Sequence, residues 1–267
     1  MKGVKLKKEL KQIRKDLLIM LNKAGSGHTA GPLGMAEIFY ELYFNFLNIN
    51  PKKPLDKNRD YLILSNGHIC PILYTVMAHR GFFKKEELLT LRKLGSRLQG
   101  HPQREHLNGL ETTSGPLGSG LSQACGISLG LQNDKKSNKV ICLTSDGEHG
   151  EGNTWEAVLF AKKHDLKIIN IIDRNYIQID GNTEDVLPLG NLKQKYESFG
   201  WEAVEIDGND LKQIKSALKK ASYAKGPFVI VANTTPGKGV SFMENNYKWH
   251  GKTPSDEELK LALEELK

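Results

Sequence analysis

The chain has 267 residues, of which 39% are hydrophobic and 26% charged, a composition that is ordinary for a soluble globular protein. No apolar run approaches the ~18 residues that a membrane span requires, so we expect no membrane partner. The formal net charge is +7, but no basic block is interleaved with aromatic residues, which favours anionic small molecules over nucleic acid as ligands.

The N-terminal residues 1–50 are predicted to form a helical segment. In MKGVKLKKELKQIRKDLL, charged and apolar residues alternate at helical spacing, which predicts an amphipathic first helix. Glu9 and Asp16 interrupt the basic residues, and no compact apolar core is followed by small residues, so this is not a secretory signal. Residues 51–60, PKKPLDKNRD, predict a loop before the first strand.

Short apolar runs alternate with helical patterns over the rest of the chain. The predicted strands are residues 61–64, 140–144, 168–172, 203–206 and 228–232, and the predicted helices include residues 86–94, 155–164, 192–199 and 211–221. The nearly continuous apolar runs VICLT and KIINII indicate strands that are buried on both faces. The alternation predicts an α/β fold with a mainly parallel central sheet and helices on both faces. Because no linker divides the chain, we expect one domain over residues 1–267.

Two of the predicted strands end in unusually polar residues. Asp146 and Gly147 come after the second strand, and Asn175 comes after the third. Ligands of open parallel sheets bind outside the carboxyl ends of the strands, so an Asp146 carboxylate and an Asn175 amide oxygen would meet there if the strands are neighbours. Such hard oxygen ligands suit Mg²⁺ or Ca²⁺, and Gly147 lets a phosphate approach the backbone near the helix that begins around Asn153. The alternative is a plain turn at Asp146 and a cap or left-handed residue at Asn175.

Among the eight histidines, His28, His68, His101 and His250 each adjoin a glycine in a predicted loop. A loop histidine is usually a solvated polar residue. Clustered imidazoles, however, can donate to hydroxyls and phosphates and move protons near neutral pH, which suits sugar-phosphate chemistry. The other four histidines, at positions 79, 106, 149 and 164, lie in less distinctive settings.

The three cysteines, Cys70, Cys125 and Cys142, lie in apolar surroundings without C-x-x-C spacing. This pattern favours reduced, buried thiols in a cytoplasmic protein over a zinc site or disulfides. Residues 115–130, GPLGSGLSQACGISLG, carry a stripe of small residues that could be mistaken for a dinucleotide-binding fingerprint. The segment follows no clear strand, and no acidic residue stands in the expected place after a second strand, so we expect close helix packing instead of an NAD site.

Five stretches of the chain resemble, in the same order, motifs of the transketolase family. They are SGHTAGPLGMAEI, SNGHICPILY, LQGHPQREHLNGLETTSGPLGSGLS, SDGEHGEGNTWEA followed by IIDRNYIQIDG, and KWHGKTP, and together they span residues 24–253. Two departures are visible. Ser145 replaces the first glycine of the family's G-D-G turn, and Thr29 and Ala30 follow His28 where the family motif S-G-H-P-G has a proline.

The resemblance implies that thiamine diphosphate and a divalent ion, Mg²⁺ or else Ca²⁺ or Mn²⁺, are the cofactors. It implies that Asp146, Asn175 and the backbone carbonyl of Ile177 hold the ion. The cofactor-binding residues that it implies are His68, Gly115, Pro116, Leu117, Asp146, Gly147, Asn175, Ile179 and His250. The catalytic residues that it implies are His28, His101, His250 and Glu151. The implied reaction moves a two-carbon ketol unit from a ketose phosphate to an aldose phosphate, as in the pentose phosphate pathway.

Full-length members of the family resemble this chain only in their first part. The chain ends at Lys267 with a charged amphipathic tail, so we expect a partner: a separate C-terminal subunit with the pyrimidine-binding domain and the activating glutamate, in an α2β2 assembly. The resemblance implies that Glu151 points toward that neighbour; the alternative is a first-turn acid that the helix dipole favours. It also implies that the small-residue helix packs at a subunit interface. Glu148 and His149 have no fixed role in the family, and we expect loop or interface residues.

Two other functions remain open at this point. One is a related thiamine diphosphate enzyme, either similar to 1-deoxyxylulose-5-phosphate synthase or a transketolase for an unusual sugar; the four histidines favour transketolase over oxo-acid dehydrogenase α-subunits. The other is a non-catalytic module that binds thiamine diphosphate or a sugar phosphate. His28, His101 and His250 argue against such a module, because a binder needs only the metal and diphosphate contacts.

Overall fold

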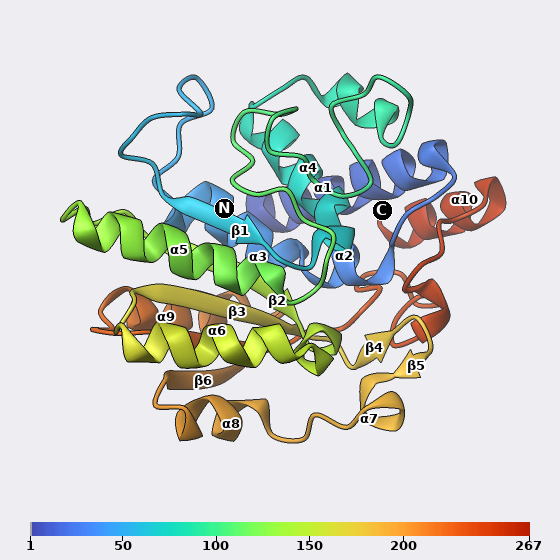
Figure 1. The fold of residues 1–267 in the computed structure, drawn as a ribbon. Helices are drawn as coiled ribbons and strands as arrows, with labels where there is room; N and C mark the ends of the chain where they lie inside the picture. Colours follow the sequence, from blue (N-terminus) through green and yellow to red (C-terminus); the bar gives the residue numbers. More distant parts are fainter. Residues whose placement is uncertain (1) are drawn as a thin grey trace.

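In a computed structural model of the protein, residues 2–267 are described, with side chains from residue 6 onward. A five-stranded sheet runs through the molecule in the order β1-β2-β3-β7-β6, and all its neighbouring strands are parallel (Figure 1). The strands are β1 (Tyr61–Leu64), β2 (Val140–Ser145), β3 (Ile168–Arg174), β6 (Glu202–Asp207) and β7 (Phe228–Asn233). All five predicted strands are therefore present, and the predicted α/β fold is confirmed.

Helices cover both faces of the sheet. One face is packed by α5 (Ser119–Asn133), α6 (Gly152–Lys163) and α8 (Leu192–Ser198), and the other by α1 (Lys2–Ala24), α2 (Ala30–Gly34), α3 (Ala36–Glu41), α4 (Cys70–Arg80), α9 (Leu211–Ser222) and α10 (Asp256–Glu265). Side chains of β2 alternate between the two cores: Ile141 and Leu143 belong to one, Val140 and Cys142 to the other. This two-sided burial explains why the strand sequence is apolar throughout.

The predicted helix at residues 86–94 is wrong. The structure has a 3-10 helix there, Lys85–Thr90, and the chain then turns through Arg92 at a positive φ of 60°. Leu88 and Leu91, three residues apart, are buried, whereas Leu94 is fully exposed. A spacing of three fits the 3-10 period, so Leu88 and Leu91 face the same buried side, and the turn at Arg92 leaves Leu94 outside.

The N-terminal segment is helical as expected, but in pieces: α1, α2, α3 and a π-helical turn over Leu42–Phe46. The hairpin β4 (Ile177–Gln178) and β5 (Gly181–Asn182), which leads into α7 (Thr183–Val186), was not predicted. The dipeptide Asp180-Gly181, a common hairpin signal, could have indicated it. Within residues 2–267 no helix is long and apolar enough to cross a membrane. The three cysteines are buried and free, as predicted.

Candidate functional site

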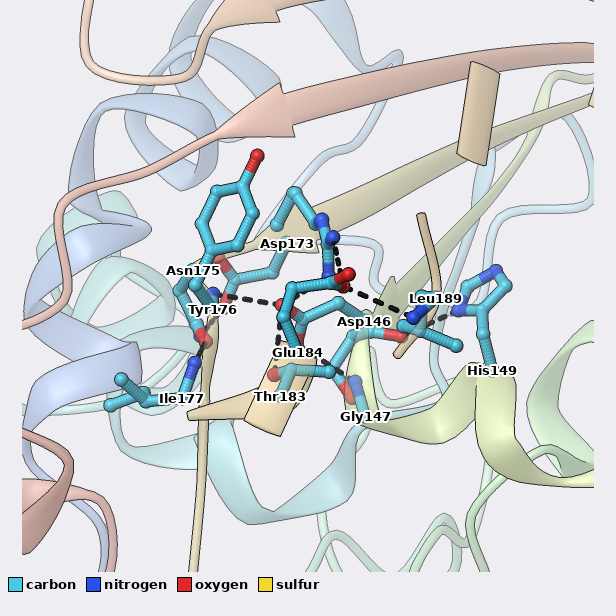
Figure 2. A network of polar contacts seen from close by, with 12 residues as sticks. Asp146, Gly147, His149, Asp173, Asn175, Tyr176, Ile177, Thr183, Glu184 and Leu189 are labelled. Carbon is cyan, nitrogen blue, oxygen red and sulfur yellow. Dashed lines mark hydrogen bonds and ion pairs between the residues drawn. The ribbon is translucent and has the colours of Figure 1, made fainter. Parts of the chain in front are cut away.

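The predicted meeting of Asp146 and Asn175 rests on the pairing of β2 with β3. Ser145 and Asp173 are partners in the register of these two parallel strands, and the Asp146 amide donates to the Asp173 carbonyl at 3.1 Å. The strands are therefore neighbours. Their carboxyl ends bring both side chains to the same edge of the sheet, beside the β4-β5 hairpin (Figures 1 and 2).

Four donors hold the buried Asp146 carboxylate (Figure 2). Its Oδ1 accepts from the Gly147 amide at 2.8 Å, and its Oδ2 accepts from the Tyr176 amide at 2.8 Å. Arg174 Nη1 and Thr183 Oγ1 each donate to Oδ2 at 3.3 Å. Burial raises the pKa of Asp146, and the Arg174 charge and these hydrogen bonds oppose the rise. The carboxylate is thus fixed in orientation before any ligand binds.

The Asn175 amide is held from both ends. Its Nδ2 donates to Asp173 Oδ2 at 2.8 Å, and its Oδ1 accepts from the Ile177 amide at 3.0 Å. Sequence reasoning missed Asp173, a fully buried carboxyl that also accepts from Thr234 Oγ1. Burial, with the nearby Asp146 charge, raises the pKa of Asp173 to about 7. The signal for it was a charged residue ending an otherwise apolar run.

These residues fit a divalent ion. Asp146, Asn175 and Ile177 lie in one hydrogen-bonded turn around Tyr176, whose φ is +62°. Among the described residues, no three His, Cys, Asp or Glu side chains could hold a metal, so an ion here must use amide and carbonyl oxygens beside one carboxylate. That set of hard oxygen ligands suits Mg²⁺ with added phosphate oxygens, and the ion would offset the cost of burying Asp146.

Three histidines distant in sequence form a triangle. The ring centroids lie 5.0 Å apart for His28 and His68, 5.4 Å for His28 and His250, and 5.2 Å for His68 and His250. His101 borders this triangle, because a Cβ added to Gly67 would lie 3.1 Å from His101 Cδ2. The structure therefore brings all four predicted site histidines together.

The four imidazoles are neutral near pH 7. Burial, helped by His250 and Arg92, lowers the pKa of His28 to about 4. Burial and the neighbouring imidazoles lower the pKa of His68 well below its usual value. Burial also lowers the pKa of His101, with Arg92 adding to the effect, and that of His250. A neutral ring has one N–H donor and one free nitrogen, so each can orient a hydroxyl or accept a proton.

Helix α2 connects the histidine triangle to the Asp146 turn. A Cβ added to Gly31, three residues after His28, would lie 3.9 Å from both Asn175 Nδ2 and Asp173 Oδ2. Five buried side-chain atoms in the described chain have no hydrogen-bond partner, and four of them belong to this region: His28 Nδ1, both amide atoms of Asn66, and Ser114 Oγ. Because unpaired buried polar atoms are costly, a ligand with polar atoms is expected among them.

The expectation that Glu148 is a loop or interface residue is wrong. Its side chain is fully buried, and Oε1 accepts from Ser65 Oγ and from the Gly118 amide, the latter at 2.6 Å. Its Oε2 accepts from the Ser145 amide at 3.1 Å. Glu148 thus ties together the end of β1, the start of α5 and the end of β2. The loop of Gly115, Pro116 and Leu117 lies directly before this anchor.

His149 is also buried, against the same expectation. Its Nδ1 donates to the Ser145 carbonyl at 2.7 Å, and its Nε2 accepts from Tyr196 Oη at 2.9 Å. Burial lowers the pKa of His149 to about 4. Both ring nitrogens are used inside the core, so this histidine supports the fold rather than facing a ligand.

Glu151 is exposed and directly precedes α6, and several large apolar side chains of the chain segments near the Asp146 turn are also exposed. Leu187 is 55% exposed, and its Cδ2 would lie 3.2 Å from a Cβ on Gly150. Leu117, Ile179 and Val186 are 36%, 68% and 43% exposed. We call Leu117, Ile179, Val186 and Leu187 the apolar rim. It lies beside the Asp146 turn.

Comparisons with known proteins agree with this geometry. Residues 6–266 match the family model described as transketolase, thiamine diphosphate binding domain. The chain is 39% identical over 264 residues to one subunit of the apulose-4-phosphate transketolase of Actinobacillus succinogenes, and the match covers 98% of this chain and 96% of that relative. It is 38% identical over 265 residues to the 6-deoxy-6-sulfo-D-fructose transketolase subunit SqwG of a Clostridium species, with the same coverage of both.

Longer relatives match over their first part. The chain is 36% identical to human transketolase over 253 residues, which are 92% of this chain and 40% of the human protein. The solved transketolase of Campylobacter jejuni superposes with a TM-score of 0.91 at 34% identity, covering 98% of this chain and 43% of that one. The chain therefore spans less than half the length of these two relatives.

Proposed function

The chain belongs to the transketolase family, and on this basis we propose that it is the N-terminal, thiamine diphosphate-binding subunit of a two-subunit transketolase. Thiamine diphosphate with a divalent ion such as Mg²⁺ is the cofactor of this family domain. In the proposed reaction a two-carbon ketol unit passes from a ketose to an aldose. The observation that carries the proposal is the meeting of four neutral histidines with the Asp146-Asn175 turn.

Thiamine diphosphate, when bound, supplies the carbon centre that accepts the two-carbon unit. The proposed role of Asp146, Asn175 and the Ile177 carbonyl is to hold the ion on its diphosphate. In the overall transfer the C2–C3 bond of the donor breaks, and a new bond forms to the aldehyde carbon of the acceptor. One donor hydroxyl must lose a proton and the acceptor oxygen must gain one. His28, His101 and His250, being neutral, can take and return those protons.

The proposed partner is a separate chain with the pyrimidine-binding domain and the activating glutamate, in a heterotetramer of two chains of each kind. Two kinds of observation support it. Relatives that match over nearly their whole length are named as subunits, and full-length transketolases continue well beyond the matched part. The apolar rim around Glu151 is a surface that such a partner could cover. We propose that Glu151 faces the partner's activating glutamate.

The proposed substrates are sugars with an anionic end. Two relatives are named for apulose 4-phosphate and for 6-deoxy-6-sulfo-D-fructose, which carry a phosphate and a sulfonate. The net charge of +7 suits either anion. As the substrate we therefore propose an unusual anionic sugar in preference to the pentose phosphates. A cytoplasmic location is also part of the proposal and rests on the buried free thiols.

The test is reconstitution. The chain is purified alone and with the product of any adjacent gene for a C-terminal subunit, and two-carbon transfer is assayed with Mg²⁺ and thiamine diphosphate. The donors compared are xylulose 5-phosphate, apulose 4-phosphate and 6-deoxy-6-sulfo-D-fructose. Transfer is expected only from the mixture. Activity of the isolated chain would contradict the two-subunit proposal, and cofactor binding without transfer to any acceptor would favour a binding role.

A further inference from the structure

Asn66 and Ser114 are buried polar side chains that nothing in the described chain satisfies. Asn66 is 0% exposed and Ser114 is 6% exposed. Neither Asn66 Nδ2, Asn66 Oδ1 nor Ser114 Oγ has a hydrogen-bond partner. Most buried polar atoms in folded proteins are paired, and the exceptions require an explanation such as a missing ligand.

The two residues lie in segments that touch each other. A Cβ on Gly67, the residue after Asn66, would lie 2.6 Å from Ser114 Oγ, so only glycine lets the segments come this close. Two members of the histidine site, His68 and His101, lie directly beside this contact. The unpaired atoms therefore border the site.

Looseness of the loops does not explain the unpaired atoms, because both segments are anchored. Glu148 accepts from Ser65 Oγ, one residue before Asn66, and from the Gly118 amide, four residues after Ser114. The Ser114 amide itself donates to the Pro102 carbonyl at 3.1 Å. The side chains are thus held in place while their polar atoms stay unpaired, which is the state of a binding site prepared for its ligand.

The position of Asn66 just after β1 indicates which part of a ligand it would contact. Leu64 at the end of β1 pairs with Leu143 of β2, so the chain leaves β1 next to the strand end that carries Asp146. Asn66 and Asp146 therefore follow the carboxyl ends of neighbouring strands. The amide Nδ2 and the Ser114 hydroxyl are donors, and the nearby imidazoles are neutral, so an anion rich in acceptor oxygens suits them.

We propose that Asn66 and Ser114 are further cofactor-binding residues, each donating a hydrogen bond to the diphosphate of thiamine diphosphate. The inference rests on the proposed function. It assigns the diphosphate two contacts in addition to those of the Asp146 turn.

Titration calorimetry on the full chain tests the inference, with Mg²⁺ present and thiamine diphosphate as the titrant. A hydrogen bond to a charged group stabilises a complex enough that Ser114→Ala and Asn66→Ala should each raise Kd about tenfold or more. In the absence of ligand, Ser114→Ala should leave the Tm unchanged or raise it, because it removes a buried hydroxyl that has no partner. Weaker binding without lost stability separates a ligand contact from a structural role.

Asn170→Ala is the matched control. Asn170 is equally buried but paired: it accepts from Thr144 Oγ1 at 3.1 Å and donates to Tyr196 Oη at 3.0 Å. This variant should have a lower Tm than the wild-type chain and the same Kd for thiamine diphosphate. Magnesium pyrophosphate, as a second titrant, should show the same loss of affinity in Ser114→Ala and Asn66→Ala.

Unchanged affinity of both site variants for thiamine diphosphate would overturn the inference while the proposed function stands. Loss of affinity for thiamine diphosphate but not for pyrophosphate would also overturn it, since the contact would then lie elsewhere on the cofactor. A wild-type chain that binds no thiamine diphosphate, either alone or together with the C-terminal subunit, would remove the proposed function and the inference with it.

Discussion

Burial controls the charge of the side chains in the candidate site. Burial raises the pKa of Asp146 and the Arg174 charge opposes the rise, whereas burial and the Asp146 charge raise the pKa of Asp173 to about 7. The histidines respond in the opposite direction and are neutral. The site therefore combines neutral imidazoles with a buried carboxylate that is paired with Arg174.

Asp146→Ala should abolish Mg²⁺-dependent binding of thiamine diphosphate, because it removes the only carboxylate among the proposed ion ligands. Calorimetry with and without Mg²⁺ measures this. Asp165→Ala, at an exposed residue paired with Lys162, is the control and should bind normally. Unchanged affinity in the Asp146 variant would exclude this residue from the metal site.

His149 should make the protein less stable in acid. Its pKa is about 4 in the folded protein against 6.5 when exposed, so the unfolded chain takes up the proton first as the pH falls. The contribution of His149 to the free energy of unfolding is complete above pH 6.5, and about 3 kcal/mol of it is lost by pH 4. Urea unfolding between pH 7 and 4.5 should show the decline. His149→Asn should make this decline shallower than it is in a His164→Asn control at an exposed position. Equal dependence of the free energy of unfolding on pH in the two variants would contradict the assignment of the decline to His149.

At the scale of elements, the start of α5 is held against the end of β1. The Gly120 amide donates to Ser65 Oγ at 3.0 Å, and Glu148 accepts from both Ser65 and Gly118. The predicted close packing of the small-residue stripe is present at Gly120, whose added Cβ would lie 2.5 Å from Ser65 Cα. Gly126 and Gly130 on the same helix have open space around them, and an interface there stays a prediction.

Gly120→Ala should therefore destabilise the protein by roughly 1–3 kcal/mol, because α5 must move away from the backbone of β1. Gly126→Ala on the same helix meets no atom within 4 Å. It should stabilise by about 0.5–1 kcal/mol through the better helix propensity of alanine. Urea unfolding of both variants checks the pair, and equal effects would show that the contact at Ser65 does not constrain the helix.

At the scale of the molecule, the apolar rim and Glu151 lie on one side of the site and are uncovered in the single chain. A group of exposed apolar side chains is typical of a surface that meets another protein. The proposed partner would cover them and supply the second part of the active site.

Hydrogen exchange should show this cover. Adding the C-terminal subunit should slow amide hydrogen exchange in residues 115–118, 150–153 and 179–187. The exchange rates of residues 135–138, which lie before β2 at the opposite end of the sheet, should not change. Leu187→Glu should weaken association at least tenfold while thiamine diphosphate binding persists. Tyr223→Glu, at a residue that is 76% exposed after α9, is the control. Equal association of both variants would place the interface elsewhere.

Much of the fold could be predicted from periodicity alone. Strands of a parallel sheet that is covered on both faces are short and largely apolar, and the five runs chosen on this basis form the five strands of the sheet, although the edge strand β6 is only partly covered. The chain direction through a parallel sheet then placed Asp146 and Asn175 at the same edge. The helix at residues 86–94 failed because leucine spacing alone does not say which side chains the rest of the protein covers.

The sequence by itself determined the architecture, the ends of the strands that carry chemistry, and the family whose motifs run through the chain. Only the tertiary structure decided the contacts of Glu148 and His149 and the burial of Asn66 and Ser114 without a hydrogen-bond partner. The contacts of Glu148 reach residues 30 and 83 positions away, and the partner of His149 lies 47 positions away. Burial and the lack of a hydrogen-bond partner depend on neighbours in space, and local sequence patterns do not encode those neighbours.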